Sequence, residues 1–232
     1  MDNVVIIIPA LNESERIANT ISEIRKYTDA DIVVVSDGST DNTADGARAS
    51  GASVIEHPFN LGYGAALQTG FKYALRHHYE FALHMDADGQ HNPYYIPVLV
   101  QEVMSGETDV AIGSRFFGGG DYKTSKRKKL GMLLFRSIAS VITGQKITDP
   151  TSGFQAMNRA AMKFCASEAY PTDFPDADVL IMLHRKGLRF KEVPVKMNQS
   201  PEKRSMHGGF IPLYYLFKML LSIFVTLLRK EK

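Results

Sequence analysis

The chain has 232 residues, 44% of them hydrophobic, which is enough for one large globular domain with a proper core. It carries 27 Lys and Arg against 25 Asp and Glu, and this near balance argues against a general nucleic-acid binder. The single cysteine, Cys165, excludes an internal disulfide and is typical of a reducing compartment.

Strands and helices are predicted to alternate along the chain. Apolar, β-branched runs at 4–8, 31–35, 53–56, 81–83 and 110–112 are typical of buried strands. Helices are predicted between them at 14–27, 41–50, 61–78 and 93–104, with Ser14 and Asp41 as capping residues. Further helices at 130–142, 158–166 and 176–186 alternate with short strands at 155–157 and 189–193. This order predicts an α/β fold, a mostly parallel sheet with helices on both faces.

Polar clusters follow four of the predicted strands. They are Asn12 with Glu13, residues 37–39, residues 86–90, and Ser114 with Arg115. Open α/β sheets bind ligands at the carboxyl ends of their strands, where the strand order reverses. Acids, small residues and one arginine converging there predict a pocket for a nucleotide and a metal ion. The glycine-rich stretch at 116–127 that follows Arg115 is expected to be a loop that closes over the ligand.

Asp86 and Asp88 stand two residues apart at the end of a buried strand. Like charges this close raise each other's pKa, and a divalent cation with oxygen ligands removes that cost. Alone, the pair fits equally well an acidic turn that caps the helix starting near Pro93. The other strand ends favour the metal site.

Residues 210–228 are almost entirely apolar, with Lys218 as their only charge. Tyr214, Tyr215 and the basic residues that follow favour a helix lying in a membrane interface. Packing on a second copy of the chain is the next alternative, and a membrane span is the third. We therefore divide the chain into a catalytic domain, 1–206, and an apolar and basic helix for membrane contact or oligomerisation, 207–232.

Six short motifs occur in a characteristic order. They are PALNE (9–13), SDGSTDNT (36–43), NLGYGAALQTG (60–70), DADGQH (86–91), GSR (113–115) and DPTSGF (149–154). Together they resemble the family 2 glycosyltransferases of GT-A fold. Within that family they look most like the dolichyl-phosphate mannose synthase group and its bacterial relatives that act on undecaprenyl phosphate. The resemblance implies a Rossmann-like GT-A sheet and an inverting, metal-dependent hexosyltransferase. The donor would be a nucleotide-diphosphate sugar and the acceptor a polyprenyl phosphate, with the enzyme peripheral on the cytoplasmic face of a membrane.

The resemblance also implies roles for individual residues. Pro9, Leu11, Glu13 and Asp37 would contact the nucleotide, Asp86 and Ala87 the donor, Lys128 and Lys129 the acceptor phosphate, and Lys203 and Arg204 the donor diphosphate. Asp88 and Gln90 would hold Mg²⁺ or Mn²⁺, and Arg115 would face the phosphates. Ser36 stands where the family more often has a first aspartate, which leaves the base specificity open.

The acceptor decides the mechanism. A lipid phosphate is already an anion and needs no general base, whereas a sugar hydroxyl needs one, for which Asp149 and Asp178 are candidates. The alternative function is therefore transfer to a hydroxyl of a lipid-linked or polysaccharide acceptor. A non-catalytic nucleotide-sugar binding protein is a third reading. It predicts a broken metal site, but Asp86, Asp88 and Gln90 are all present.

Overall fold

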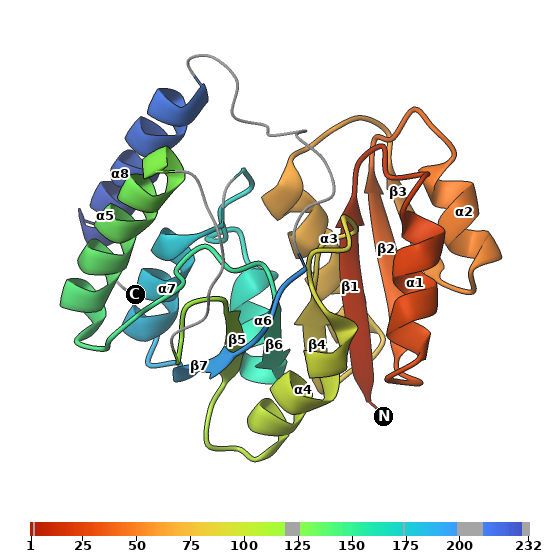
Figure 1. The fold of residues 1–232 in the computed structure, drawn as a ribbon, viewed down its shortest axis with the longest axis horizontal. Coiled ribbons are helices and arrows are strands. Elements are labelled where there is room, and N and C mark those ends of the chain that lie inside the picture. Colours follow the sequence, from red (N-terminus) through yellow and green to blue (C-terminus); the bar gives the residue numbers. More distant parts are fainter. Residues whose placement is uncertain (2, 119–125, 174, 199–210, 229–232) are drawn as a thin grey trace.

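A seven-stranded sheet forms the centre of the protein (Figure 1). The computed structural model describes residues 1, 3–118, 126–173, 175–198 and 211–228, and of 126–130 and 211–216 only the backbone. The strands are β1 (Val4–Ala10), β2 (Asp31–Asp37), β3 (Ser53–His57), β4 (Phe81–His84), β5 (Val110–Ser114), β6 (Gln155–Asn158) and β7 (Phe190–Pro194). Their order is β3-β2-β1-β4-β6-β5-β7, and only β6 runs antiparallel to its neighbours. The predicted, mostly parallel α/β sheet is confirmed.

Helices cover both faces of the sheet (Figure 1). They are α1 (Ile17–Arg25), α2 (Thr43–Ala49), α3 (Tyr63–Arg76), the 3-10 turn η1 (Pro93–Tyr95), α4 (Ile96–Met104), α5 (Lys126–Thr143), α6 (Arg159–Cys165), α7 (Ala177–Arg185) and α8 (Ile211–Leu228). Apolar residues of α1, α2 and α4 pack on one face, and those of α3, α5, α6, α7 and α8 pack on the other.

The central strand β1 shows why such strands read as unbroken apolar runs. Ile6 and Ile8 face the core under α1 and α4, while Val5 and Ile7 face the core under α3. All seven residues of β1 are buried because both faces of the sheet are covered.

Two predicted helix starts differ from the structure. Helix α1 begins at Ile17 without a side-chain cap, and Ser14 instead donates its backbone N–H to Asp41 across 3.1 Å. Helix α5 begins at Lys126 rather than at 130, so Lys128 and Lys129 lie in its first turn and not on a preceding loop. Of the loop predicted at 116–127, residues 119–125 lie outside the described part of the chain.

The C-terminal helix α8 packs against α7 on the domain. Met219, Ile223 and Thr226 are buried on its inner side, and Lys218 forms an ion pair with Asp173. Its outer side leaves apolar side chains exposed, namely Phe217, Leu220, Leu221, Phe224, Val225, Leu227 and Leu228. Among the described residues, no helix combines the length and apolarity needed to cross a membrane.

The strand order has two effects at the edge of the sheet where the parallel strands end. The chain builds β1, β2 and β3 to one side and then returns through α3 to β4 on the other side of β1, so the order reverses between β1 and β4. Because β6 is antiparallel, the loop that precedes it arrives at the carboxyl ends of β4 and β5. Residues 148–154 therefore join the strand-end loops.

We expect Gly70→Ala to destabilise the fold. A Cβ atom at Gly70 would lie 2.3 Å from Ile7 Cγ2, so α3 must move away from β1. Overpacking of this kind costs about 1–3 kcal/mol. The matched control is Gly131→Ala in α5, where a Cβ atom meets nothing within 4 Å and where alanine gains up to about 1 kcal/mol of helix propensity. Urea unfolding measures both variants, and equal stability of Gly70→Ala and the wild type would contradict the packing described.

Candidate active site

The strand-end loops of β1 and β2 are bonded to each other. Asn12 donates its backbone N–H to Ser39 Oγ over 3.1 Å, and its Oδ1 accepts the N–H of Thr40 over 2.9 Å. Beside them lies a polar surface hollow of about 240 Å³, lined by residues 12–16 and Asp41. Glu13, predicted to contact the nucleotide, is part of its wall, where it also pairs with Arg16 at 2.9 Å. Desolvation alone would raise the pKa of Asp41, but hydrogen bonds from Thr43 and Ser14 outweigh it and lower the pKa to about 2.

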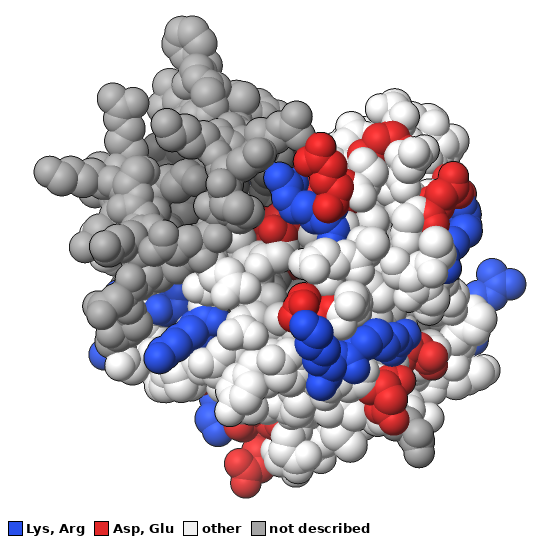
Figure 2. All heavy atoms as spheres, turned by 45° about the vertical axis from the view of Figure 1, so that its right-hand side comes forward, with Lys and Arg blue, Asp and Glu red and all other residues white. Residues whose placement is uncertain are grey.

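Charges of both signs are interleaved on the face shown in Figure 2, where Lys and Arg side chains lie next to Asp and Glu side chains. No broad surface of one sign forms among the described residues on this face. An anionic ligand there must be held by individual, well-placed groups rather than by a general basic field.

Asp37, the last residue of β2, organises the entry to α3. Its Oδ1 accepts the N–H of Leu61 and its Oδ2 that of Gly62, both at 2.9 Å, and His57 Nδ1 lies 2.7 Å from Oδ1. The next residue, Gly38, has φ +71°, and a Cβ there would lie 2.4 Å from the backbone of residues 59–60, so only glycine fits. The structure gives Asp37 an anchoring role, and its contact with base or ribose remains a prediction.

The loop after β4 holds Asp86, Asp88 and Gln90. Tyr63 donates its hydroxyl to Asp86 Oδ1 over 2.8 Å. Asp88 Oδ1 accepts the backbone N–H of Gln90 over 2.9 Å, and the Gln90 side-chain amide donates to Asp88 Oδ2. The backbone of this loop is held from outside, because Asn198 donates to the carbonyl of Gln90 over 2.8 Å. The loop that carries the two carboxylates is therefore held in place by a hydrogen bond from outside the loop.

His91, directly after this loop, is a packing residue. Its ring stacks on Phe154 at 5.0 Å, and its Nδ1 accepts the backbone N–H of Asp86 over 3.0 Å. Burial raises the pKa of the Asp86 carboxyl, and the charge of Asp88 adds to this, while His91, Tyr63 and Arg115 act in the opposite direction. Ionised Asp86 is thus costly in the absence of a cation.

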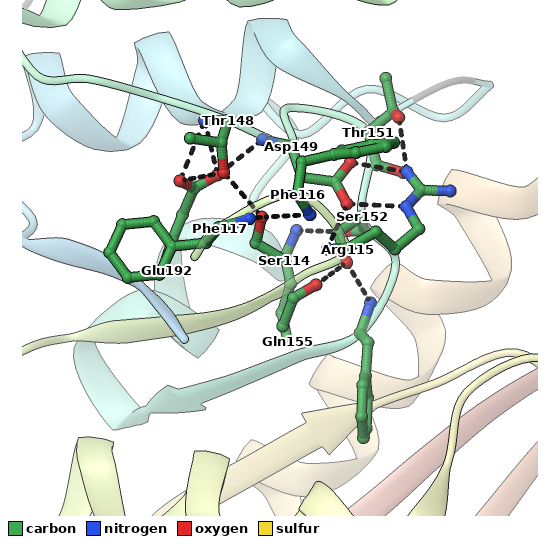
Figure 3. Close-up of polar contacts among 12 residues, drawn as sticks. Ser114, Arg115, Phe116, Phe117, Thr148, Asp149, Thr151, Ser152, Gln155 and Glu192 are labelled. Atoms are coloured by element: carbon green, nitrogen blue, oxygen red, sulfur yellow. Dashed lines mark hydrogen bonds and ion pairs between the residues drawn. The ribbon is translucent and has the colours of Figure 1, made fainter. Parts of the chain in front are cut away.

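Arg115 and Asp149 form a bidentate ion pair (Figure 3). Arg115 Nε lies 2.7 Å from Asp149 Oδ2, and Nη2 lies 2.6 Å from Oδ1. The backbone N–H of Arg115 also donates to Oδ2 over 3.0 Å, and Nη2 donates to Thr151 Oγ1 over 3.0 Å. Asp149 is fully buried and both its oxygens are occupied. This geometry does not support the general-base role considered for Asp149, because a base needs a free oxygen facing the acceptor.

Glu192 on β7 was not identified from the sequence. Its carboxylate accepts the backbone N–H groups of Thr148 and Asp149 and the Thr148 hydroxyl (Figure 3). The alternation of side chains along this strand could have indicated it. In β7, Phe190 is buried, Lys191 is exposed and Glu192 is buried, so an acid occupies a core-facing position. A buried acid in a strand implies specific donors around it.

The segment at 148–154 also lies against Tyr63 and Asp86. A Cβ atom at Gly153 would lie 2.9 Å from Tyr63 Oη and 3.4 Å from Asp86 Oδ2. Asp86, Tyr63, Gly153 and the Arg115–Asp149 pair are therefore parts of one site.

The other predicted site residues are distributed as follows. Pro9 is buried in β1, Leu11 is exposed at its end, and Ala87 is buried. Lys128 and Lys129 are placed only by the backbone of α5, and Lys203 and Arg204 lie outside the described residues. Asp178 lies in the first turn of α7, and its Oδ2 accepts the hydroxyl of Ser222 on α8 over 2.5 Å. The roles assigned to these residues stay predictions.

Sequence comparison identifies relatives along nearly the whole chain. The Glycosyl transferase family 2 model matches residues 5–164. An uncharacterised protein of Methanocaldococcus jannaschii is 34% identical over 95% of this chain and 92% of its own. The UDP-N-acetylglucosamine–dolichyl-phosphate N-acetylglucosaminyltransferase of Methanococcus voltae is 29% identical over 82% of this chain and 84% of its own. The undecaprenyl-phosphate mannosyltransferase of Micrococcus luteus is 31% identical over 90% of this chain and 89% of its own.

A solved structure shares the fold. Glucosyl-3-phosphoglycerate synthase from Mycobacterium tuberculosis, crystallised with Mn²⁺ and UDP-glucose, superimposes with a TM-score of 0.70. The alignment covers 96% of this chain and 78% of that chain at 21% identity.

We expect Asp178→Asn to stabilise the protein at neutral pH. Burial raises the pKa of Asp178, although hydrogen bonds from Ser222 and from the backbone N–H groups of residues 176, 178 and 179 oppose this. A raised pKa means that this group's contribution to stability is full below the ordinary carboxyl value near 3.9 and is lost as the pH rises through the raised value. Asparagine does not ionise and can still bond Ser222. Its melting temperature should exceed that of the wild type at pH 7, and the gap should close towards about pH 4.

Asp41→Asn is a control for which we expect the opposite change in melting temperature. The lowered pKa of Asp41 means that its contribution is present above the ordinary value and lost as the pH falls. Asparagine at position 41 should therefore lower the melting temperature at pH 7. A pH-independent difference for Asp178→Asn would show that burial of its charge is not the cause.

Proposed function

Because the chain belongs to glycosyl transferase family 2, we propose that it moves a hexose from a nucleotide-diphosphate sugar to a polyprenyl phosphate, with inversion at the anomeric carbon. The observation that carries this proposal is the convergence of the Asp86–Gln90 loop and the Arg115–Asp149 pair at one edge of the sheet. The names of the Methanococcus voltae and Micrococcus luteus relatives, both acting on a polyprenyl phosphate, support the acceptor class.

The donor nucleotide is proposed to lie over the ends of β1 and β2. The polar hollow at residues 12–16 and Asp41 supplies backbone and side-chain donors and acceptors there. The sugar diphosphate would then extend towards Asp86 and Asp88, since β1 and β4 are neighbours in the sheet. This path follows the reversal in strand order, where α/β sheets bind their ligands.

A divalent cation fits the residues of the Asp86–Gln90 loop. Among the described residues, no three His, Cys, Asp or Glu side chains gather as a metal site, so the protein would supply few ligands. Mg²⁺ can bind with few protein ligands, because it keeps waters and takes phosphate oxygens from the substrate. The Gln90 amide now donates to Asp88 Oδ2, and rotating it by half a turn would bring two oxygens together. Such a pair needs a cation between them. When bound, Mg²⁺ or Mn²⁺ would stabilise the charge of the leaving diphosphate.

Arg115 is proposed to stabilise the negative charge that develops on the β-phosphate as the bond to the anomeric carbon breaks. Its fork geometry is set by Asp149, so it acts as an oriented donor rather than as a mobile charge. The attacking oxygen belongs to the acceptor phosphate, which is an anion at neutral pH. No proton has to be removed, which agrees with the commitment of Asp149 to Arg115.

The acceptor lipid is proposed to approach along α5 and α8, with the enzyme peripheral on the cytoplasmic face of the membrane. Both helices pack on α7 and leave apolar side chains exposed, among them Leu133, Leu134, Phe217 and Phe224. Lys128 and Lys129 lie in the first turn of α5. Basic residues there, together with the positive end of the helix dipole, favour an anionic headgroup or the acceptor phosphate.

Transfer should require both the cation and the acceptor phosphate. We expect the sugar of the correct nucleotide donor to enter the lipid phase with undecaprenyl phosphate plus Mg²⁺ or Mn²⁺, but not with undecaprenol or with excess chelator. Asp88→Ala should lower the rate by at least about 100-fold and abolish Mn²⁺ binding measured by electron paramagnetic resonance. The matched control is Asp45→Asn, an exposed carboxylate on α2 that pairs with Arg48 at 3.0 Å.

Two results would contradict the proposal. A rate unchanged by chelator and by Asp88→Ala excludes the metal mechanism. Product formed only with a saccharide acceptor establishes the hydroxyl alternative, for which Asp178→Asn should then abolish turnover while donor binding persists.

Replacing the outer apolar residues of α8 should release the protein from membranes. Phe217 and Phe224 are seven residues apart, on one side of the helix, and are 63% and 58% exposed. We expect the double change to serine to lower the fraction that sediments with anionic vesicles several-fold, without loss of thermal stability. The control changes Tyr94 and Val98, also exposed but on η1 and α4, to serine. Equal sedimentation of the α8 variant and this control would exclude α8 as the contact.

A further inference from the structure

Glu192 is a buried carboxylate that none of the roles above uses. It lies on β7, opposite Ile112 of β5, and is only 8% exposed. A charge in such a place is costly unless donors surround it. The neighbouring strand β5 supplies no basic partner for Glu192, because it consists of apolar and small residues.

The donors come from the loop before β6. The Thr148 N–H lies 2.9 Å from both carboxylate oxygens, and the Asp149 N–H lies 2.7 Å from Oε1. The Thr148 hydroxyl donates to Oε2 over 2.7 Å. Glu192 therefore binds two successive backbone N–H groups of this loop, and such bonds to an ionised acceptor are the strong ones.

This contact determines where Asp149 lies, and Asp149 in turn orients Arg115. Thr148 Oγ1 also lies 2.7 Å from Ser114 Oγ, which accepts the N–H of Phe117 over 3.1 Å (Figure 3). The residues on both sides of Arg115 and the partner of its guanidinium are thus tied to one carboxylate. The same loop reaches Asp86, since a Cβ atom at Gly153 would lie 3.4 Å from Asp86 Oδ2.

We propose that Glu192 is a positioning residue of the transfer reaction, acting through Asp149 on Arg115. Glu192 does not touch the substrate. Its carboxylate holds residues 148–149 so that the guanidinium of Arg115, bound through its fork to Asp149, is fixed in place beside the leaving phosphate. The inference rests on the role proposed for Arg115 and adds to it the residue that sets its geometry. Misplacing a catalytic group by about 1 Å can cost on the order of 100-fold in rate.

The decisive experiment is a double-mutant cycle between Glu192→Gln and Arg115→Lys. In Glu192→Gln the side-chain NH₂ group faces the backbone N–H donors of residues 148–149, which loosens the loop before β6. We expect kcat to fall about 10- to 100-fold while KM for the donor changes less than about threefold. In the Arg115→Lys background, which lacks the bidentate fork, Glu192→Gln should lower kcat no further. Equal losses in both backgrounds would overturn the proposal and leave a purely structural role.

Asp109→Asn is the matched control. Asp109 is a second partly buried acid beside the same strands, paired with Arg189 at the opposite end of β5 and β7. It should lower thermal stability without a change in kcat.

A second pair of variants serves if Glu192→Gln does not fold. Thr148→Val removes the hydroxyl that is bonded to Glu192, and Thr148→Ser keeps it. Thr148→Val should reduce kcat severalfold and Thr148→Ser should not, and equal rates for the two variants would overturn the proposal.

A spectroscopic readout separates this inference from the proposed function. The Nε–H resonance of Arg115, assigned by its loss in Arg115→Lys, reports the bond to Asp149 without any substrate. We expect it to shift and broaden in Glu192→Gln and to stay unchanged in Asp109→Asn. An unshifted resonance would overturn the positioning role even if transfer is observed. A shifted resonance in an enzyme whose wild type transfers no sugar would instead reject the proposed function alone.

Discussion

The Arg115–Asp149 ion pair depends on the direction of a single strand. Because β6 runs against β4 and β5, the loop before it reaches the carboxyl edge of the sheet, where β5 has just delivered Arg115. A parallel β6 would have placed this loop at the opposite edge of the sheet. The reversal also brings Gly153 against Tyr63 and Asp86, so the residues proposed to bind the donor and to stabilise the leaving group lie at one edge.

Most polar groups near this edge are committed to one another. Asp37 holds the entry to α3, Asp149 holds Arg115, and Glu192 holds Thr148. Asp86 and Asp88 lie in one short loop, where Asp86 accepts the Tyr63 hydroxyl and Asp88 accepts the backbone N–H of Gln90. The cation proposed for this protein would lie at this loop, where two carboxylates stand two residues apart. Asp149 and Glu192, by contrast, bond groups within the protein.

Much of this could be predicted from the chain alone. The family inferred from six motifs is confirmed by the match over residues 5–164, and the mostly parallel sheet follows from its β-branched runs. Strand ends were located to within two residues, because apolar runs stop close to where polar clusters begin. Helix starts were less reliable: Ser14 was expected to cap α1, but its N–H bonds Asp41, and α5 begins four residues earlier than predicted. At Ser14, local propensity was overridden by a contact from the loop after β2.

Residue type and order are local properties, so the chain alone indicates which residues could carry the chemistry. Asp149 was a candidate base and Glu192 was overlooked, because spacing along the chain does not reveal partners 34 and 43 residues away. The folded chain makes Asp149 the buried partner of Arg115 and makes Glu192 the acceptor of the Asp149 N–H. The physical reason is that a carboxylate's role follows from which donors surround it, and those donors come from strands that meet only after the sheet has formed.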